Sequence, residues 1–480
     1  MRSSLAACVA CLLIASCSSE GPAGGASAAS SPALAAPSQS TELVMSATPP
    51  SSSSTQASST PPAAEPPIAV RGRALTTLLS EGKLADVVKE FDAAMSAALP
   101  EAKLAEMWGG LVKQAGPFGG IAGVQVVAAG AYQTAVVTTR FGQSSLDLKL
   151  AFDASGKVSG LFVSATPAPW SLPSYADASR FEEREVVVGA DPWQLPGTLT
   201  LPKGATKVPV VILVHGSGPG DRDESIGPNR PFKDLAAGLA SRGVAVLRYE
   251  KRTRQHGPKI DLASFGLDDE SVDDALAAVE LLSKEAAVDP ARIFVAGHSL
   301  GGTFAPRIAQ KAKGVAGVAL LAGATRRVPE MMIEQLEYIA SLDGARSAEE
   351  AAQIEGVKKA KKRVDEIVGG AAAKPGEVIL GAGPKYWLEL GKYDPVATAK
   401  GVDTRFFVAQ GGRDYQVTEV DFKAWQAALS GKKGSVFKLY PSLNHIFVTG
   451  NGKSVPDEYQ QAGHVDEALV NDLAAWIVGS

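Results

Sequence analysis

The chain is poor in cysteine and histidine, the residues that form thiol sites and that act as bases near neutral pH. It has three cysteines and five histidines among 480 residues. The cysteines are Cys8, Cys11 and Cys17, so none follows the first seventeen positions. A disulfide framework, a cysteine nucleophile and a cysteine metal site are therefore excluded from the rest of the chain.

The chain also lacks a large excess of charge of either sign. Lys and Arg total 47, Asp and Glu total 51, and the net charge is −4. This balance gives no general attraction to nucleic acid or to an anionic membrane surface, so we expect no nucleic-acid partner. Beyond the N-terminus the sequence has no run of the ~20 apolar residues that a transmembrane helix needs. With 45% apolar residues, the chain is expected to form globular cores.

The first seventeen residues have the pattern of an exported lipoprotein. Arg2 precedes an apolar run from Leu5 to Ala15, which is typical of a short signal peptide. The run ends in Leu-Ile-Ala-Ser-Cys17, which resembles the bacterial lipoprotein box. The resemblance implies removal of residues 1–16, a lipid on Cys17, and anchoring in the cell envelope. Serines at positions 18 and 19 imply the outer membrane, facing the periplasm. The alternative is an ordinary signal peptide with an incidental cysteine.

Two further segments precede the main domain. Residues 17–68 are almost entirely Ser, Ala, Pro, Thr and Gly, which predicts a disordered tether. Residues 69–166 change from helical to alternating spacing and predict a small α+β domain. Its expected helical stretches are 74–79, 84–99 and 100–114, and its expected strands are 123–129, 131–140, 145–152 and 158–163. The segment resembles a small domain of unknown function that precedes many bacterial secreted hydrolases. It contains no histidine, and both a structural and a ligand-binding role stay open.

From residue 180 to residue 480, short apolar strands alternate with amphipathic stretches. This alternation predicts an α/β domain with a mostly parallel, eight-stranded sheet and helices on both faces. The expected strands are 185–188, 197–201, 208–214, 244–249, 292–296, 317–321, 405–409 and 435–439. The expected helices are 231–242, 269–286, 301–313, 417–429 and 466–478. Residues 324–402 interrupt the alternation with a long helical insertion, and we expect it to be functional.

Ser299 is the expected nucleophile. It lies in Gly297-His298-Ser299-Leu300-Gly301, directly after an expected strand and at the start of a helix. The pentapeptide alone is a weak signal in a chain rich in glycine. A sharp strand-to-helix turn with small neighbours, however, is the setting that exposes a serine hydroxyl for attack. Because a serine hydroxyl is a poor nucleophile without a base, a histidine must lie near it in the fold.

Residues 180–480 resemble bacterial α/β-hydrolases of the dienelactone-hydrolase and acyl-thioesterase-like group. The stretches that carry the resemblance are His215-Gly-Ser-Gly-Pro, Asp221-Arg-Asp-Glu, Gly297-His-Ser-Leu-Gly-Gly, Gln410-Gly-Gly-Arg-Asp and Leu443-Asn-His. The resemblance implies the α/β-hydrolase fold, with residues 324–402 as a helical cap over the active site. Dienelactone hydrolases proper use a cysteine nucleophile, so a serine at position 299 points to ester chemistry.

In that fold the catalytic base follows the last strand and the acid follows the penultimate strand. His445 and Asp414 occupy these positions, and the chain order Ser299, Asp414, His445 is the order that the fold uses. The acid would fix the tautomer of the histidine and stabilise its imidazolium. The weaker candidates are His464 for the base, and Asp394 and Glu419 for the acid.

The glycine-rich segment 215–220 is the expected oxyanion loop. It follows strand 208–214, and its glycines allow backbone amides to point into the site. The expected donors are the amides of Ser217 and Leu300, and one such donor is typically worth ~3 kcal/mol in the transition state. Phosphate binding is the alternative, but no Gly-Lys-Ser/Thr follows the segment and no Gly-x-Gly-x-x-Gly fits it. We expect no cofactor and no metal.

Two polar clusters, residues 221–224 and 248–254, follow strands at the same edge of the expected sheet. Ligands bind at the carboxyl ends of parallel strands in this architecture. Arg248 and Arg252 are therefore candidates for contact with an anionic or hydroxyl-rich substrate. The alternative is that the clusters form mutual salt bridges that order the loops.

Together these patterns predict a lipid-anchored serine hydrolase that cleaves small carboxylic esters through an acyl-enzyme. An acyl thioesterase or a serine peptidase could use the same three residues, although coenzyme A substrates are not expected outside the cytoplasm. A third hypothesis is an inactive, surface-tethered binding lipoprotein. The complete set of expected site residues argues against it.

Replacing Cys17 by serine tests the anchor. Serine cannot receive the thioether-linked lipid, so the Cys17→Ser protein should lose labelled fatty acid and leave the membrane fraction. Cys8→Ser, which alters a cysteine of the expected signal peptide, should keep both properties. Lipid labelling and membrane association of Cys17→Ser at the level of the parent would contradict the lipoprotein hypothesis.

Overall fold

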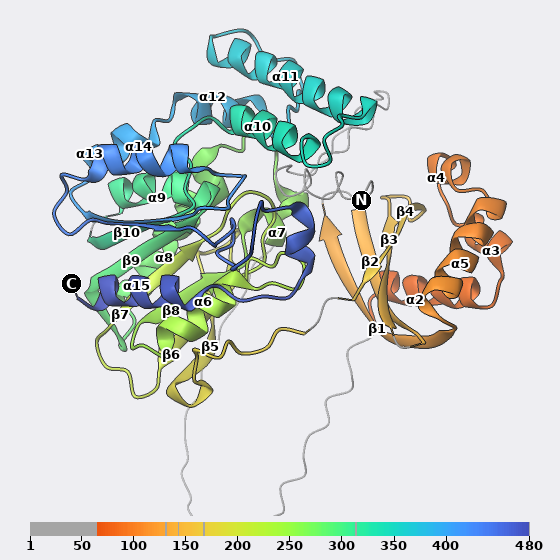
Figure 1. Cartoon of the computed structure of the whole chain (residues 1–480), viewed down its shortest axis with the longest axis horizontal. Coiled ribbons are helices and arrows are strands. Elements are labelled where there is room, and N and C mark those ends of the chain that lie inside the picture. The colour runs from red at the N-terminus through yellow and green to blue at the C-terminus, as the bar shows by residue number, and fades with distance from the viewer. Residues whose placement is uncertain (1–64, 130–131, 143, 167–168, 313, 480) are drawn as a thin grey trace, which may run out of the picture.

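The computed structural model describes residues 65–479 apart from residues 130–131, 143, 167–168 and 313. It contains a four-stranded and an eight-stranded sheet, formed by separate parts of the chain (Figure 1). The expected signal peptide, Cys17 and nearly all of the expected tether lie outside the described residues. In the described part of the chain, no helix is both long enough and apolar enough to cross a membrane.

The first part is a helical layer packed on an antiparallel sheet, which confirms the predicted α+β domain. The sheet order is β1-β2-β3-β4, and each neighbouring pair is antiparallel. Leu79 and Leu104 from the helices pack with Phe141 and Leu150 from the sheet in one core. The elements are α2 (Pro67–Ser80), α3 (Leu84–Val88), α4 (Ala93–Ala98), α5 (Glu101–Ala115), β1 (Phe118–Ala129), β2 (Tyr132–Phe141), β3 (Ser144–Phe152) and β4 (Val158–Ala165).

The helical stretch expected over 84–99 is two short helices, so that prediction was wrong. Phe91 forms an isolated bridge with Val158 of β4, and the backbone of Asp92 also hydrogen-bonds to Val158. The Asp92 carboxylate then accepts a bond of 2.6 Å from the Met95 amide and caps α4. The apolar spacing is continuous, but the pairing of this segment with β4 interrupts the helix.

The eight-stranded sheet has the order β12-β11-β10-β9-β7-β8-β6-β5. The six strands from β12 to β8 are mutually parallel, whereas β6 and β5 are antiparallel to their neighbours. All eight predicted strands are present, with ends shifted by a few residues. They are β5 (Phe181–Val188), β6 (Leu195–Pro202), β7 (Val208–Val214), β8 (Ala245–Tyr249), β9 (Val288–His298), β10 (Val315–Leu321), β11 (Arg405–Gly411) and β12 (Val436–Tyr440).

Helices cover both faces of this sheet (Figure 1). Because side chains alternate across a strand, β7 contributes Val211 and Leu213 to one core and Val210 and Ile212 to the other. The first core lies under α6 (Pro231–Ala240) and α15 (Glu467–Val478). The second lies under α8 (Asp273–Ser283), α9 (Leu300–Lys311) and α14 (Glu419–Leu429). Burial of apolar residues on both faces is what a mainly parallel sheet requires.

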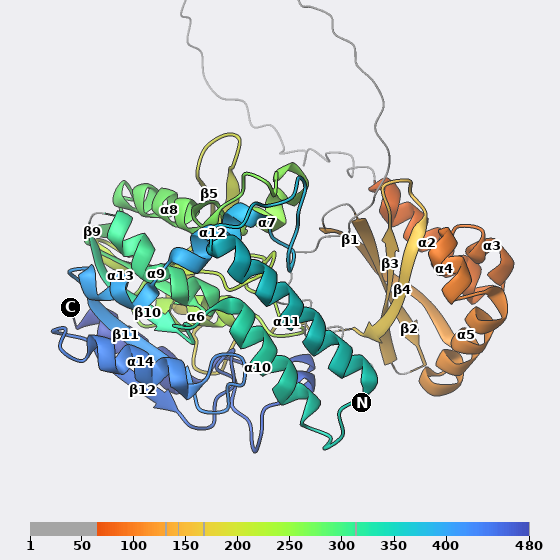
Figure 2. The ribbon, with the colours of Figure 1, turned by 90° about the horizontal axis from the view of Figure 1, so that it is seen from above.

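The insertion between β10 and β11 contains four helices, α10 (Val328–Ala340), α11 (Ala348–Val368), α12 (Pro384–Lys392) and α13 (Pro395–Gly401). The first three lie side by side across one end of the domain and share two small cores of their own (Figure 2). The last one differs, because Ala399 and Val402 pack into the core of the main domain. We use the word cap below for α10, α11 and α12.

Candidate active site

Ser299 occupies a strained turn between β9 and α9. Its backbone has φ 53° and ψ −119°, in a region that a residue with a side chain rarely adopts. The neighbouring positions require glycine because there is no room for a side chain. A Cβ on Gly297 would collide with the carbonyl of Gly301, and one on Gly302 would lie 2.7 Å from the Cα of Gly323. The sharp turn expected from the pentapeptide is therefore present, and it places Ser299 at a pocket wall.

His445 and Asp414 meet beside this turn. Nδ1 of His445 lies 2.7 Å from Oδ2 of Asp414, and both side chains are buried. The same oxygen accepts a bond of 3.1 Å from Nε2 of Gln410. The other oxygen accepts bonds from the amides of Gln416 at 2.8 Å and Val417 at 3.0 Å. A carboxylate fixed in this way holds the proton of His445 on Nδ1 and leaves Nε2 able to accept one.

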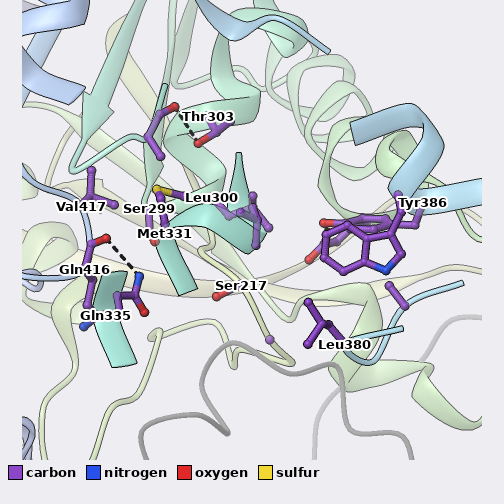
Figure 3. Close-up of a pocket in the computed structure, with 16 residues that line it drawn as sticks. Ser217, Ser299, Leu300, Thr303, Met331, Gln335, Leu380, Tyr386, Gln416 and Val417 are labelled. Carbon is purple, nitrogen blue, oxygen red and sulfur yellow. Dashed lines mark hydrogen bonds between the residues drawn. The ribbon is translucent and has the colours of Figure 1, made fainter. Parts of the chain in front are cut away.

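Two pockets meet at Ser299, which lines both of them. In the first pocket, Figure 3 shows Met331 beside Ser299 with Leu380 and Tyr386 across the view. The second pocket is lined by His445 and Tyr415, among other residues. The first pocket extends under the cap, and the second carries the candidate base.

The segment 215–220, the expected oxyanion loop, borders both pockets. Ser217 lines both pockets and Leu300 lines the first, so both expected donors lie on a wall that Ser299 shares. The neighbouring amide of Gly216 donates instead to Oε1 of Glu224 at 2.7 Å, so it is committed to that carboxylate. The loop and the first turn of α9 thus border the pocket wall that contains Ser299.

Comparisons with known proteins identify the family of this chain. A family model described as "Alpha/beta hydrolase family" matches residues 211–465. Esterase EstD of Thermotoga maritima is 39% identical over 385 residues, which are 80% of this chain and 89% of that protein. The chain belongs to the alpha/beta hydrolase family.

Other comparisons concern the small domain and the fold. A family model described as "Protein of unknown function (DUF3887)" matches residues 73–161 of this hydrolase. The solved structure of Est1E from Butyrivibrio proteoclasticus is 17% identical, covers 62% of this chain and 99% of its own, and has a TM-score of 0.39. A puromycin-hydrolyzing peptidase of Mycobacterium tuberculosis is 17% identical, with coverage of 74% and 47% and a TM-score of 0.43. These two structures are too distant to bear on the activity.

The other candidates for base and acid lie elsewhere in this hydrolase. Nδ1 of His464 lies 3.0 Å from Oδ1 of Asp234, and His464 lines neither pocket at Ser299. Asp394 caps α13 by accepting a bond of 2.9 Å from the amide of Ala397. Glu419 lies in the first turn of α14 and pairs with Lys423 at 3.1 Å. The structure brings none of the three to Ser299.

The two arginines considered for substrate contact are held in ion pairs. The buried guanidinium of Arg248 pairs with Glu183 and Asp223. Arg252 is also buried, pairs with Asp274, and lies over the ring of Trp193 at 5.2 Å. Neither arginine lines a pocket at Ser299. The contacts therefore favour the alternative in which these clusters order the loops, and they give no support to substrate binding by Arg248 and Arg252.

Sequence reasoning missed a buried pair next to the nucleophile, formed by His298 and Glu224. Nδ1 of His298 lies 3.0 Å from Oε2 of Glu224, without the alignment of a hydrogen bond. Nε2 of His298 lies 2.9 Å from the carbonyl oxygen of His445. An oxygen atom thus lies within 3.0 Å of each ring nitrogen, an arrangement that favours the doubly protonated imidazolium. Through these contacts and the bond from the Gly216 amide to Glu224, the pair connects the expected oxyanion loop, the turn at Ser299 and the loop of the candidate base.

The electrostatics agree with an ion pair. Burial alone lowers the pKa of His298, but the charge of Glu224 and the contact with it raise that pKa, and the net shift is upward. Burial raises the pKa of Glu224, but His298 lowers it, and the net shift is downward. Both residues belong to stretches that the sequence singled out, 221–224 and the pentapeptide. The contact between His298 and Glu224 depends on how the chain folds, and neither stretch of sequence by itself predicts it.

Titration of His298 by NMR tests this pair. Its midpoint should lie above the ordinary value of about 6.5, and in Glu224→Gln it should fall below that value because burial then acts without a counter-charge. His215, whose pKa burial lowers to about 4, is a neutral reference in the same spectra. Because the pKa of His298 is raised in the folded protein, its protonation adds to the free energy of unfolding. This contribution is complete below about pH 6.5 and is lost as the pH rises through the folded-state pKa of His298. A neutral His298 at pH 6 in the parent would contradict the ion pair.

Proposed function

We propose that this hydrolase cleaves carboxylic ester bonds with Ser299 as nucleophile, His445 as general base and Asp414 as the residue that orients His445. The observation that carries the proposal is the 2.7 Å contact between His445 and Asp414, with His445 and Ser299 on the wall of one pocket. The choice of an ester is supported by the 39% identity to a protein named as an esterase.

The reaction proceeds through an acyl-enzyme. Nε2 of His445 removes the proton of the Ser299 hydroxyl as its oxygen attacks the ester carbonyl, and Asp414 stabilises the resulting imidazolium. The amides of Ser217 and Leu300 stabilise the oxyanion. His445 then gives its proton to the departing alcohol. Water, deprotonated by His445, attacks the acyl-enzyme, and the carboxylic acid leaves with the Ser299 hydroxyl restored.

The two pockets take the two halves of the ester. Because His445 must reach the oxygen of the leaving group, the pocket that His445 lines takes the alcohol. The pocket under the cap, without His445, takes the acyl group. Its wall includes Val328, Met331, Leu380 and Trp387, which suit an apolar acyl chain. A thioester or an amide would use the same three residues, and a panel of substrates separates these bonds.

We also propose that the enzyme acts at the bacterial cell envelope, held by a lipid on Cys17. The support for this is the sequence of residues 1–19. A flexible tether of roughly fifty residues would have an end-to-end distance of roughly 40 Å, enough to hold the folded part clear of the lipid. Such a position exposes the pocket to small esters in the surrounding compartment.

Ser299→Ala tests the proposed reaction on p-nitrophenyl esters of increasing chain length, with thioesters and aminoacyl anilides alongside. Loss of the nucleophile should reduce kcat by about 10⁴-fold or more on the preferred bond, with the circular dichroism spectrum and Tm retained. Ser430→Ala, at the exposed C-terminal end of α14, should keep the parent activity. Turnover by folded Ser299→Ala at the parent rate would reject the proposal. Preference for anilides or thioesters would replace the ester assignment while keeping the residues.

A further inference from the structure

Lys251 is a buried charge that the proposed reaction does not use. It follows β8, is 2% exposed, and belongs to the polar cluster 248–254. Its ammonium donates to the carbonyl of Gly216 at 2.7 Å and to Oε1 of Glu270 at 2.7 Å. Removing a charged pair from water costs several kcal/mol per ion before pairing compensates it. A pair of apolar side chains of similar volume could fill the same space without this cost, so fold stability alone does not require the Lys251–Glu270 pair.

The contact with Gly216 controls the direction of the next amide. The carbonyl of Gly216 and the N–H of Ser217 belong to one peptide unit, and in a trans peptide they point in opposite directions. An ammonium on the carbonyl therefore fixes the direction of the Ser217 N–H, the proposed oxyanion donor. It also polarises the unit, which strengthens that N–H as a donor. The preceding peptide unit is fixed as well, because the Gly216 amide donates to Glu224 at 2.7 Å.

Glu270 connects Lys251 to the cap. It is 1% exposed and lies in a π-helical turn, Asp268–Val272, that leads into α8. Such turns are rare and are frequent at functional sites. Its Oε2 accepts a bond of 2.6 Å from the hydroxyl of Tyr386, which is on α12. Burial, with the charge of Glu270, raises the pKa of Tyr386 well above its ordinary value, so the hydroxyl stays a donor.

Tyr386 lines the proposed acyl pocket together with Ser299, Leu300 and Ser217 (Figure 3). Glu270 lines the same pocket. A continuous series of three bonds thus runs from the wall of that pocket to the carbonyl of the oxyanion loop. Each bond is between 2.6 and 2.7 Å, and three of its groups, Tyr386, Glu270 and Lys251, are buried. An acyl chain in the pocket would pack against Tyr386, the residue of this series that lies on the cap helix α12.

We propose that Tyr386, Glu270 and Lys251 couple occupancy of the acyl pocket to the alignment of the oxyanion hole. Tyr386 holds Glu270, Glu270 holds Lys251, and Lys251 holds the Gly216 carbonyl so that the Ser217 amide points at the oxyanion. All three are positioning residues, since they act through that peptide unit. The proposal rests on the proposed function, because the direction of this amide matters only if Ser299 attacks a carbonyl.

Tyr386→Phe tests the coupling by removing one hydroxyl. Loss of a hydrogen bond to a charged group at this point should lower kcat by about tenfold, with KM changed less than twofold. The loss should be greater for esters with acyl chains long enough to reach Tyr386 than for acetate esters. The matched control is Tyr440→Phe, which removes a hydroxyl that donates to Asp472 at 2.9 Å outside both pockets and should leave kcat unchanged.

A transition-state analogue separates this role from a purely structural one. A trifluoromethyl ketone forms an oxyanion adduct with a nucleophilic serine, so its Kd should weaken in Tyr386→Phe by the factor that kcat/KM loses. An unchanged kcat in Tyr386→Phe, or a rise in KM alone, would overturn the coupling. Failure of the proposed function has a different signature, because Ser299→Ala would then keep its turnover.

The Lys251→Met, Glu270→Gln double variant removes both charges together and leaves no lone buried charge. If it keeps the fold by circular dichroism, its kcat should fall by about 10²-fold, the effect of a misdirected oxyanion donor. Adding Tyr386→Phe to it should cause no further loss, because the three residues act as a unit. A folded double variant with the kcat of the parent, or a full additional loss from Tyr386→Phe, would contradict the proposal.

Discussion

The end of β7 and the start of α9 meet so closely that no side chain fits between them. A Cβ on Gly301 would collide with the carbonyl of Val214, the last residue of β7. The same contact fixes the distance between the turn at Ser299 and the proposed oxyanion loop, because that loop begins at the residue after Val214. The unusual backbone angles of Ser299 persist because the strand and the helix on either side are each held by a buried core.

Around this junction, the described residues include three buried pairs of opposite ionisable groups. They are Asp414 with His445, Glu224 with His298, and Glu270 with Lys251. Removal of one partner of such a pair typically costs ~3–5 kcal/mol, although a pair need not stabilise the fold relative to apolar residues. Two of the pairs contact Gly216, because its amide donates to Glu224 and its carbonyl accepts from Lys251. In the third pair, Asp414 orients the proposed base, His445. Their shared effect is to restrict the positions of three loops that a reaction at Ser299 needs.

The sequence predicted the sheet well because its strands are short, apolar and separated by clear helices. The order of the strands around β7 and the antiparallel pairing of β5 and β6 were not predicted, because local spacing does not specify which strands are neighbours. Ser299, Asp414 and His445 could be proposed because each lies at a strand end with a known place in the fold. The structure brings His445 to Asp414 and to the pocket of Ser299.

The remaining features depend on contacts between distant segments. The segment expected to be one helix over 84–99 is divided because Phe91 pairs with β4, a contact that apolar periodicity does not encode. Lys251 and the neighbouring arginines carry the same charge, yet Lys251 reaches the carbonyl of Gly216 and Arg252 reaches Asp274. Glu270 and Tyr386 lie in different elements, and only the fold brings them together at the pocket. Such assignments require the loop conformations, which the sequence does not specify locally.

The most direct test of the nucleophile is covalent trapping with a fluorophosphonate, followed by mass spectrometry of the digested protein. We expect one phosphonylated residue, Ser299, and loss of the label when His445 is replaced by alanine, because the hydroxyl then has no base. A label on another serine, or undiminished labelling of Ser299 in His445→Ala, would contradict the assignment of these two residues.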